Sequence, residues 1–476
     1  MGSICRQLVV LVAVALSTLV VAAPADASGR LKIGIYEEVL TLGNPNVGFP
    51  YLGELRPQVL RFNLYWHQVA PSRPADPYNP LAPEYDWSKY DQAIQGAQAI
   101  GAEVLLHVIG TPNWANGGRG WRYAPTSMAD LHSFTVAAAR RYSGQPLADG
   151  RVFPAVWRWA AWNEPNLSRF LKPTWARVDG RLVPVAARKY ARICNAVWKG
   201  VHDAAREAVR PVQVACGVTS PYGKGKTSIS PIRFIRELKR AKARFDVYAH
   251  HPYGRNKLTS PTTIPSDRRS QVSLGNIRDL FAELTRLYGK RKKLWITEYG
   301  YQTRPPDPAG VSYARQAAWM RLAHTIVRRH PRIDLFLWFL VQDEPDRNGP
   351  AFGYDGWQSG LLSANGKRKP AFEAFRRHST QLQAQLRFFF HRAVKYLIAV
   401  LAAVLGLVHG AIGGGHELLG REPVLGVGNE ADADAGRRLG PTDRQADFLC
   451  PGADLLGDDE GADDVGLREQ DHELVA

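Results

Sequence analysis

The chain has 476 residues, of which 45% are hydrophobic and 13 are tryptophan, and its formal net charge is +17. This composition is typical of a globular protein with a sizeable core and excludes a disordered chain. The length allows one large domain with extra material, or two to three average domains. Because no nucleic-acid-binding module accompanies the basic charge, we expect no nucleic-acid partner.

The first 27 residues predict an export signal. Arg6 gives a basic start, residues 8–23 form a run of low polarity, and residues 25–27 form a small-residue cleavage site. The run is short for a membrane span, and an uncleaved anchor is the alternative to cleavage. In either case we expect the rest of the chain to be secreted or extracytoplasmic, with membrane or cell-wall association open.

From residue 31 onward, short apolar runs alternate with helical patterns. The runs are rich in β-branched and aromatic residues, as in strands buried on both faces of a parallel sheet. They cover residues 31–36, 59–66, 103–109, 156–162, 212–219, 245–251, 294–299 and 335–341. Helical stripes lie between them; one follows Ser88 as the expected cap. This order predicts an α/β fold, a (β/α)₈ TIM barrel, over residues 31–377.

A doubly wound open sheet is the main alternative to the barrel. That fold normally carries a glycine-rich turn after its first strand. Here Gly34 and Gly43 stand alone, which favours the barrel.

Two of the predicted strands lead into a glutamate. Glu164 follows the run at 156–162, and Glu298 follows the apolar residues Leu294 to Ile296. An acid beside a buried strand is costly unless it faces a cavity or an ion-pair partner. In a closed barrel, two such acids three strands apart can face each other across the mouth where the βα loops gather. Glycoside cleavage requires a carboxyl pair of this kind.

The two sequences around these acids resemble known motifs. Trp162-Asn163-Glu164-Pro165-Asn166 and Ile296-Thr297-Glu298-Tyr299-Gly300 are similar to the acid/base and nucleophile motifs of glycoside hydrolase clan A, nearest to families 39 and 5. The resemblance covers residues 31–377. It implies a retaining O-glycosidase with Glu164 as acid/base and Glu298 as nucleophile. It also implies a carbohydrate substrate, polysaccharide or oligosaccharide, and no metal or organic cofactor.

The resemblance extends to six further positions, which it implies bind substrate or support the pair. Arg61 corresponds to an arginine that keeps the nucleophile ionised, and Asn163 to an amide that contacts the sugar 2-hydroxyl. Of the adjacent His250 and His251, only one can face the pocket, and the motif favours His251. The six positions are Arg61, His107, Asn163, His251, Tyr253 and Trp338. Loop aromatics that could stack on sugars are Trp66, Trp114, Trp121, Tyr123 and Trp357.

Several alternatives stay open at this point. A transglycosylase would use the same residues with a sugar acceptor, and a non-catalytic carbohydrate-binding barrel would lack one of Glu164, Glu298 or Arg61. The sugar, its linkage, endo or exo action and the oligomeric state are not indicated. Cys194 and Cys216 could form a bridge in an exported protein or remain free thiols.

Residues 378–476 differ from the rest. From residue 379 onward the chain has 8 basic and 16 acidic residues, against 53 basic and 28 acidic before it, and no tryptophan. This composition predicts disorder. The apolar segment at 396–413 is near the minimum length for a membrane tether. The alternative is that this tail is the product of a shifted reading frame.

Overall fold

The computed structural model describes residues 31–205, 211–345 and 356–380. The expected signal at 1–27, the apolar segment at 396–413 and nearly all of the expected tail lie outside the described residues. Within the described ranges, no helix has the length and apolar character needed to cross a membrane.

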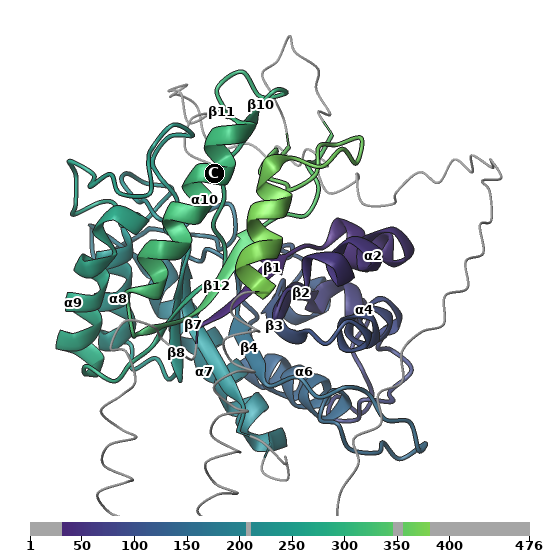
Figure 1. Ribbon diagram of the computed structural model, residues 1–476. Coiled ribbons are helices and arrows are strands. Elements are labelled where there is room, and N and C mark those ends of the chain that lie inside the picture. Colours follow the sequence, from purple (N-terminus) through teal and green to yellow (C-terminus); the bar gives the residue numbers. More distant parts are fainter. Residues whose placement is uncertain (1–30, 206–210, 346–355, 381–476) are drawn as a thin grey trace, which may run out of the picture. The chain divides into compact units, whose positions relative to one another are not determined.

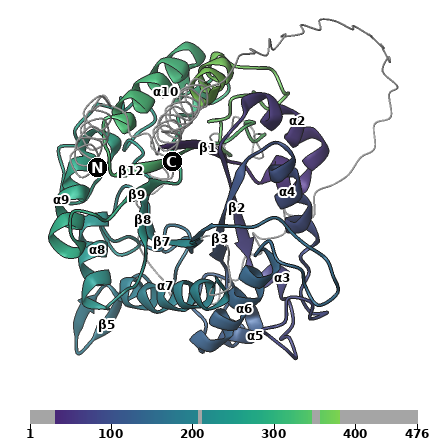
Figure 2. The same ribbon diagram turned by 60° about the horizontal axis from the view of Figure 1, so that its bottom comes forward.

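Eight parallel strands of the described residues close into a barrel, which Figures 1 and 2 show from two sides. β1 pairs with both β2 and β12, so the sheet has no free edge. The TIM barrel is therefore confirmed, and the doubly wound open sheet is excluded. The strands are β1 (Lys32–Tyr36), β2 (Val59–Tyr65), β3 (Glu103–Ile109), β4 (Arg158–Ala161), β7 (Gln213–Thr219), β8 (Val247–His250), β9 (Leu294–Ile296) and β12 (Ile333–Phe339).

The strand ends differ from the sequence-based limits. β4 is shorter than the run at 156–162, β8 is shorter than 245–251, and β9 ends three residues before 299. β12 is displaced by two residues from 335–341. The apolar residues beyond these ends are buried in loops instead of pairing in the sheet. Hydrophobicity predicts their burial but not the point at which strand pairing stops.

A ring of helices surrounds the barrel (Figure 2). The longer ones are α2 (Pro45–Leu55), α4 (Ser88–Ala99), α6 (Met128–Arg141), α7 (Val185–Ala204), α8 (Pro231–Arg240), α9 (Ile277–Tyr288) and α10 (Tyr313–Arg328), and residues 370–380 are also helical. Ser88 was expected to be the N-cap of α4, but it is the first residue of the helix. The side chain of Asp86 accepts hydrogen bonds from the backbone and hydroxyl of Ser88 at 3.0 and 2.6 Å.

Short elements decorate the loops. They are the helical turns η1 (Val39–Gly43), α3 (Trp66–Val69), α5 (Asn113–Asn116) and η3 (Leu274–Asn276), the hairpin β5–β6 (Ala176–Val178, Arg181–Val183) and the pair β10–β11 (Thr303–Arg304, Val311–Ser312). The β5–β6 hairpin lies between β4 and α7, and α5 lies in the loop after β3.

The alternation of side chains along each strand divides the core in two. One set fills the barrel interior and includes Val59, Leu105, Ala160, Ala249, Trp295, Leu335 and Leu337. The other set packs between strands and helices and includes Phe62, Leu106, Phe336 and Trp338. Because side chains on a strand repeat every two residues, Arg61, His107 and His251 continue the interior rows toward the C-terminal mouth of the barrel.

A disulfide joins Cys194 on α7 to Cys216 on β7. The structure therefore selects the bridge over the two free thiols that the sequence left as an alternative. The link closes a loop with a sequence separation of 22. A loop of that size stabilises a fold by about 3 kcal/mol through the lost entropy of the unfolded chain.

Candidate active site

Both glutamates lie in loops at the C-terminal end of the barrel. Glu164 comes three residues after the end of β4, and Glu298 two residues after the end of β9. Their side chains are nearly buried, with 4% and 7% of each residue exposed. Trp162 and Glu164 both have left-handed backbone angles, with φ of 65° and 34°. Residues other than glycine rarely adopt this backbone conformation, and such strain concentrates at functional sites. This turn carries the chain out of β4 and directs Glu164 toward the barrel axis.

His251 connects the two carboxyl groups. Its Nδ1 lies 2.9 Å from Glu164 Oε1 and 3.4 Å from Glu298 Oε2. One oxygen of each glutamate and a ring nitrogen of His251 all lie within 4.8 Å of one another. The neighbouring His250 points away from the pair, toward Thr219 and the backbone of Val272.

The His251 ring is neutral. Burial, with the charge of Arg61 and the neighbouring His250, lowers the pKa of His251 well below its ordinary value. Its contact with Glu164 is therefore a hydrogen bond and not an ion pair. Nδ1 faces two carboxyl groups, so we assign the proton to Nδ1, and Nε2 then accepts from the Thr297 hydroxyl at 3.0 Å.

Arg61 holds Glu298 in place. Its guanidinium is fully buried and donates to Glu298 Oε1 at 2.7 Å and to the Thr297 carbonyl at 3.0 Å. The other terminal nitrogen donates to Asn163 Oδ1 at 2.8 Å, which leaves the amide NH₂ of Asn163 as the group available to a ligand. The guanidinium also lies 4.0 Å from the centre of the Tyr36 ring. Because one terminal nitrogen bonds to Glu298 and the other to Asn163, this planar cation orients the carboxylate as well as compensating its charge.

The two glutamates differ in their electrostatic surroundings. Burial and the charge of Glu298 raise the pKa of Glu164 well above its ordinary value, although Arg61 and Arg169 lower it. Burial also raises the pKa of Glu298, while Arg61 and Tyr253 lower it. Arg61 thus acts in the direction predicted from the sequence, but burial outweighs it. Because only Glu298 bonds directly to the arginine, Glu298 ionises first and Glu164 retains its proton.

Two further predicted residues lie at this centre. The Tyr253 hydroxyl donates to Glu298 Oε2 at 3.2 Å. His107 is fully buried on β3. Burial, followed by the charges of Arg61 and His251, lowers the pKa of His107 well below its ordinary value. Both histidines are therefore uncharged beside Arg61.

Trp338 is not brought to this centre. It packs in the outer core between strands and helices, is fully buried, and donates its indole N–H to the Ser359 carbonyl at 2.9 Å. The reason is its position on β12: Leu335 and Leu337 point inward, so Trp338 points outward and Phe339 continues the inward row. Trp338 therefore does not face the carboxyl pair, contrary to the substrate-binding or supporting position that the resemblance implied for it.

The loop aromatics divide between core and active face. Trp66 is almost fully buried in the core, and Trp114 packs edge-on against it with its indole N–H bonded to the Ala70 carbonyl. Trp357 packs against Phe339 at 5.5 Å between ring centres. Both line a small hollow that Tyr253 also lines, next to Glu298. Trp357 therefore shares a hollow with Tyr253, which bonds to Glu298.

Glu38 is a third carboxyl near the site that the sequence analysis did not single out. Its Oε1 accepts from the Asn63 backbone at 2.5 Å and its Oε2 from the Tyr65 hydroxyl at 2.9 Å. Burial raises the pKa of Glu38 to about 7, against lowering by these hydrogen bonds and by Arg61. The adjacent Glu37 is different: it accepts backbone hydrogen bonds from Leu40 and Val341 and joins two loops. The rule that identified Glu164, an acid within a few residues of the end of a buried strand, would also have identified Glu37 and Glu38 after β1.

The same cluster is also the place where a metal ion could be held. Glu164, His251 and Glu298 are the described residues whose ligand atoms converge as in a metal site. Arg61 already compensates the charge of Glu298, which weakens the attraction for a cation. The arrangement fits acid–base chemistry between two carboxyl groups better than metal coordination.

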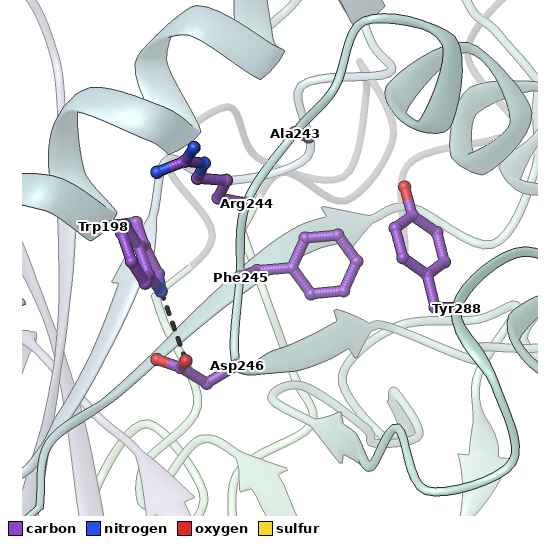
Figure 3. Close-up of a pocket in the computed structure, with 6 residues that line it drawn as sticks. All are labelled: Trp198, Ala243, Arg244, Phe245, Asp246 and Tyr288. Atoms are coloured by element: carbon purple, nitrogen blue, oxygen red, sulfur yellow. Dashed lines mark hydrogen bonds between the residues drawn. The ribbon is translucent and has the colours of Figure 1, made fainter.

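A separate hollow lies at the opposite end of the barrel (Figure 3). It is lined by Trp198, Arg244, Phe245, Asp246 and Tyr288, among others. Asp246 comes just before β8, whereas the catalytic candidates follow strand ends. Its carboxylate already accepts from the Trp198 indole at 3.2 Å, as Figure 3 shows, and from His202 and the Val214 backbone. This acid therefore has a structural role at the N-terminal end of the barrel.

Fold and site together define a (β/α)₈ barrel with a buried carboxyl pair at the C-terminal ends of its strands. The chain belongs to the family of unknown function DUF5722, whose model matches residues 138–395. No curated protein matches the chain.

Solved structures with a similar fold include glycosidases. A family 39 glycoside hydrolase from the gut symbiont Bacteroides cellulosilyticus WH2 is 18% identical, with a TM-score of 0.52 over 75% of this chain. A glucosidase from Croceicoccus marinus is 14% identical, with a TM-score of 0.54 over 76% of this chain. The chain covers 64% of the first structure and 69% of the second. At these identities the likeness establishes the fold.

Proposed function

We propose that the protein is a retaining O-glycoside hydrolase that uses Glu164 and Glu298 in a double displacement. The observation that carries this proposal is the approach of the two carboxyl groups: one oxygen of each and a ring nitrogen of His251 lie within 4.8 Å of one another. Retaining enzymes have their carboxyl groups about 5–5.5 Å apart, whereas inverting enzymes need about 6.5–9.5 Å to admit a water molecule. The approach in this site favours retention. The expected export signal would put this activity outside the cytoplasm.

In the first step, Glu164 gives its proton to the glycosidic oxygen. The raised pKa of Glu164, caused by burial and by the charge of Glu298, keeps that proton available. Glu298 Oε2 attacks the anomeric carbon as the bond to the leaving group breaks, which forms a glycosyl ester on Glu298. Arg61 stays on Oε1 and orients the attacking oxygen.

In the second step, Glu164 acts as a base. It removes a proton from water, which attacks the anomeric carbon and releases Glu298 with overall retention. In the ester, Glu298 carries no negative charge, which removes one cause of the raised Glu164 pKa. The pKa of Glu164 therefore falls, and Glu164 ionises as its role as a base requires. The NH₂ group of Asn163 is left to donate to the sugar 2-hydroxyl, because its oxygen is held by Arg61. This mechanism requires neither a metal nor an organic cofactor.

The proposal is tested by hydrolysis of a panel of aryl glycosides and polysaccharides by the full chain. On any substrate that is cleaved, proton NMR at early times should show the anomer of the substrate's own configuration. First appearance of the opposite anomer would contradict the double displacement. Absence of hydrolysis across the whole panel would contradict the glycosidase itself.

Replacement of Arg61 by methionine should shift the pH profile of that activity. Without the guanidinium, the pKa of Glu298 rises further, so the acid limb of kcat/KM moves to higher pH. The buried Glu298 also loses its partner, which should lower the free energy of unfolding by about 3–5 kcal/mol. Both are measured on the purified variant, by a pH–rate profile and by denaturant unfolding.

Arg61→Lys is the matched control. It keeps a positive charge, but a single ammonium cannot reproduce the fork that bridges Glu298 and Asn163. We expect a smaller shift of the acid limb than in the methionine variant. An unshifted limb in Arg61→Met would refute the role of Arg61 in ionising Glu298.

A further inference from the structure

Five cations lie on the loops after β3 and β4 and near the start of α7, at the end of the barrel that carries the acid/base. We call them the basic cluster: Arg119, Arg122, Arg169, Lys172 and Lys189. Arg169 is exposed and belongs to the loop that carries Glu164. It is one of the two cations that lower the pKa of Glu164, the other being Arg61. Arg169 is therefore the member of the cluster that acts electrostatically on the catalytic centre.

The cluster residues are close to one another. The Lys172 backbone donates to the Arg122 carbonyl at 2.9 Å, and Lys172 pairs with Tyr123 in a backbone β-bridge. The guanidinium of Arg119 lies 5.5 Å from the centre of the Tyr123 ring. Burial, and then the charge of Arg122, lowers the pKa of Lys172. Burial and then the charge of Arg119 do the same to Lys189. A cation held beside another cation is unfavourable until an anion joins them.

Within the described ranges, the structure gives none of these five cations an ion pair. Arginines elsewhere on the surface do have such partners. Examples are Arg73 with Asp130, Arg236 with Glu283, Arg268 with Asp279 and Arg368 with Glu54. Other surface cations in the part of the chain that the structure describes also have no ion pair, so what distinguishes these five is their grouping on neighbouring loops at the end of the barrel that carries Glu164.

We propose that the cleft beside Glu164 binds an anionic sugar unit on the leaving-group side, so that the substrate is an acidic polysaccharide bearing carboxylate or sulfate groups. This inference rests on the proposed glycosidase function. Glu164 protonates the leaving group, and the basic cluster belongs to the loop of Glu164 and the loop beside it. Arginine binds carboxylate and sulfate groups through paired hydrogen bonds, and a cluster of one sign raises the local concentration of an oppositely charged ligand.

Binding of such a unit would also assist the chemistry. An anion on Arg169 cancels the charge that lowers the Glu164 pKa, so the acid holds its proton more firmly in the complex. A neutral sugar would leave the opposing charge of Arg169 in place. The same cluster would therefore act on both affinity and proton retention.

The test compares binding of three polymers to the full-length protein by titration calorimetry: polygalacturonate for carboxylates, dextran sulfate for sulfates, and neutral dextran. The variants are Arg122→Gln/Lys172→Gln, Arg169→Gln, and the control Lys290→Gln/Arg291→Gln, which removes two charges at the N-terminal end of the barrel. We expect binding of at least one polyanion, and cluster variants that bind it about tenfold more weakly, with the loss fading at high salt. The control should bind as the unmodified protein does.

Equal losses in cluster and control variants would overturn the inference, because they would indicate a non-specific basic surface. Equal binding of dextran and both polyanions would overturn it as well. Preference for one polyanion identifies the acidic group. Hydrolysis of the polyanions and of neutral aryl glycosides is measured in parallel. Absence of all hydrolysis reports failure of the glycosidase proposal, whereas hydrolysis of neutral glycosides without polyanion binding reports failure of this inference alone.

Discussion

Replacement of Glu298 by alanine is expected to abolish turnover, with a loss on the order of 10⁶-fold, the scale of removing an enzymatic nucleophile. The carboxylate forms the covalent bond in the proposed mechanism, and no other described carboxyl group has its contacts with Arg61, Tyr253 and His251. The alanine side chain leaves a space beside the anomeric carbon. The loss is measured as kcat on the best substrate of the panel.

Added azide should restore turnover of Glu298→Ala and give a glycosyl azide of inverted configuration, because the small anion replaces the missing oxygen in a single displacement. Glu298→Gln is the matched control: it fills the same volume, so azide should not rescue it. The melting temperature of each variant separates loss of chemistry from loss of folding. Normal activity of Glu298→Ala would refute the nucleophile assignment.

The barrel could be predicted because its strands are buried on both faces. Such strands are continuous apolar runs, and each run at 31–36, 59–66 and 103–109 coincides with a strand to within one residue at either end. Glu298 shows why other limits were missed. β9 pairs over only three residues, and the following Thr297, Glu298 and Tyr299 are as buried as the strand itself. Burial is encoded locally, whereas the end of pairing depends on the neighbouring strands.

Most of the predicted site residues are connected by hydrogen bonds. Their inward positions can be counted from the sequence, because side chains alternate between the two faces of a strand. Arg61 lies two residues after the interior Val59, and His251 two after Ala249. Trp338 was misplaced because a motif fixes the position in the chain but not the side of β12. The count from Leu335 would have given the outward face.

Contacts across the barrel could not be predicted. The link of Arg61 to Asn163 joins residues 102 apart in the sequence. The disulfide likewise depends on how α7 packs against β7. Glu38 could have been predicted, since it follows a buried strand, but the adjacent Glu37 has the same sequence signal and the sequence does not show which of the two faces the site. Their separate roles follow only from the loops that contact each carboxyl group.

Replacement of Glu164 by glutamine should lower kcat by about 10²–10⁴-fold on substrates with poor leaving groups. Glutamine keeps the volume and can still contact His251, but it has no proton to give to the glycosidic oxygen. Aryl leaving groups with low pKa need little protonation, so their first step should be much less affected. A loss of kcat/KM, which reports the first step only, that is the same for good and poor leaving groups would contradict the acid role of Glu164.

The same variant should also change the pH profile. In the unmodified protein, burial and the charge of Glu298 raise the Glu164 pKa, and activity falls as the pH rises through that value and the proton is lost. Glu164→Gln has no group to deprotonate there, so the alkaline limb of kcat/KM should disappear. The acid limb should remain, because it reports protonation of Glu298, which keeps its contact with Arg61. If the alkaline limb persisted in Glu164→Gln, another residue would have to be the acid, and the paired carboxyl mechanism would fail.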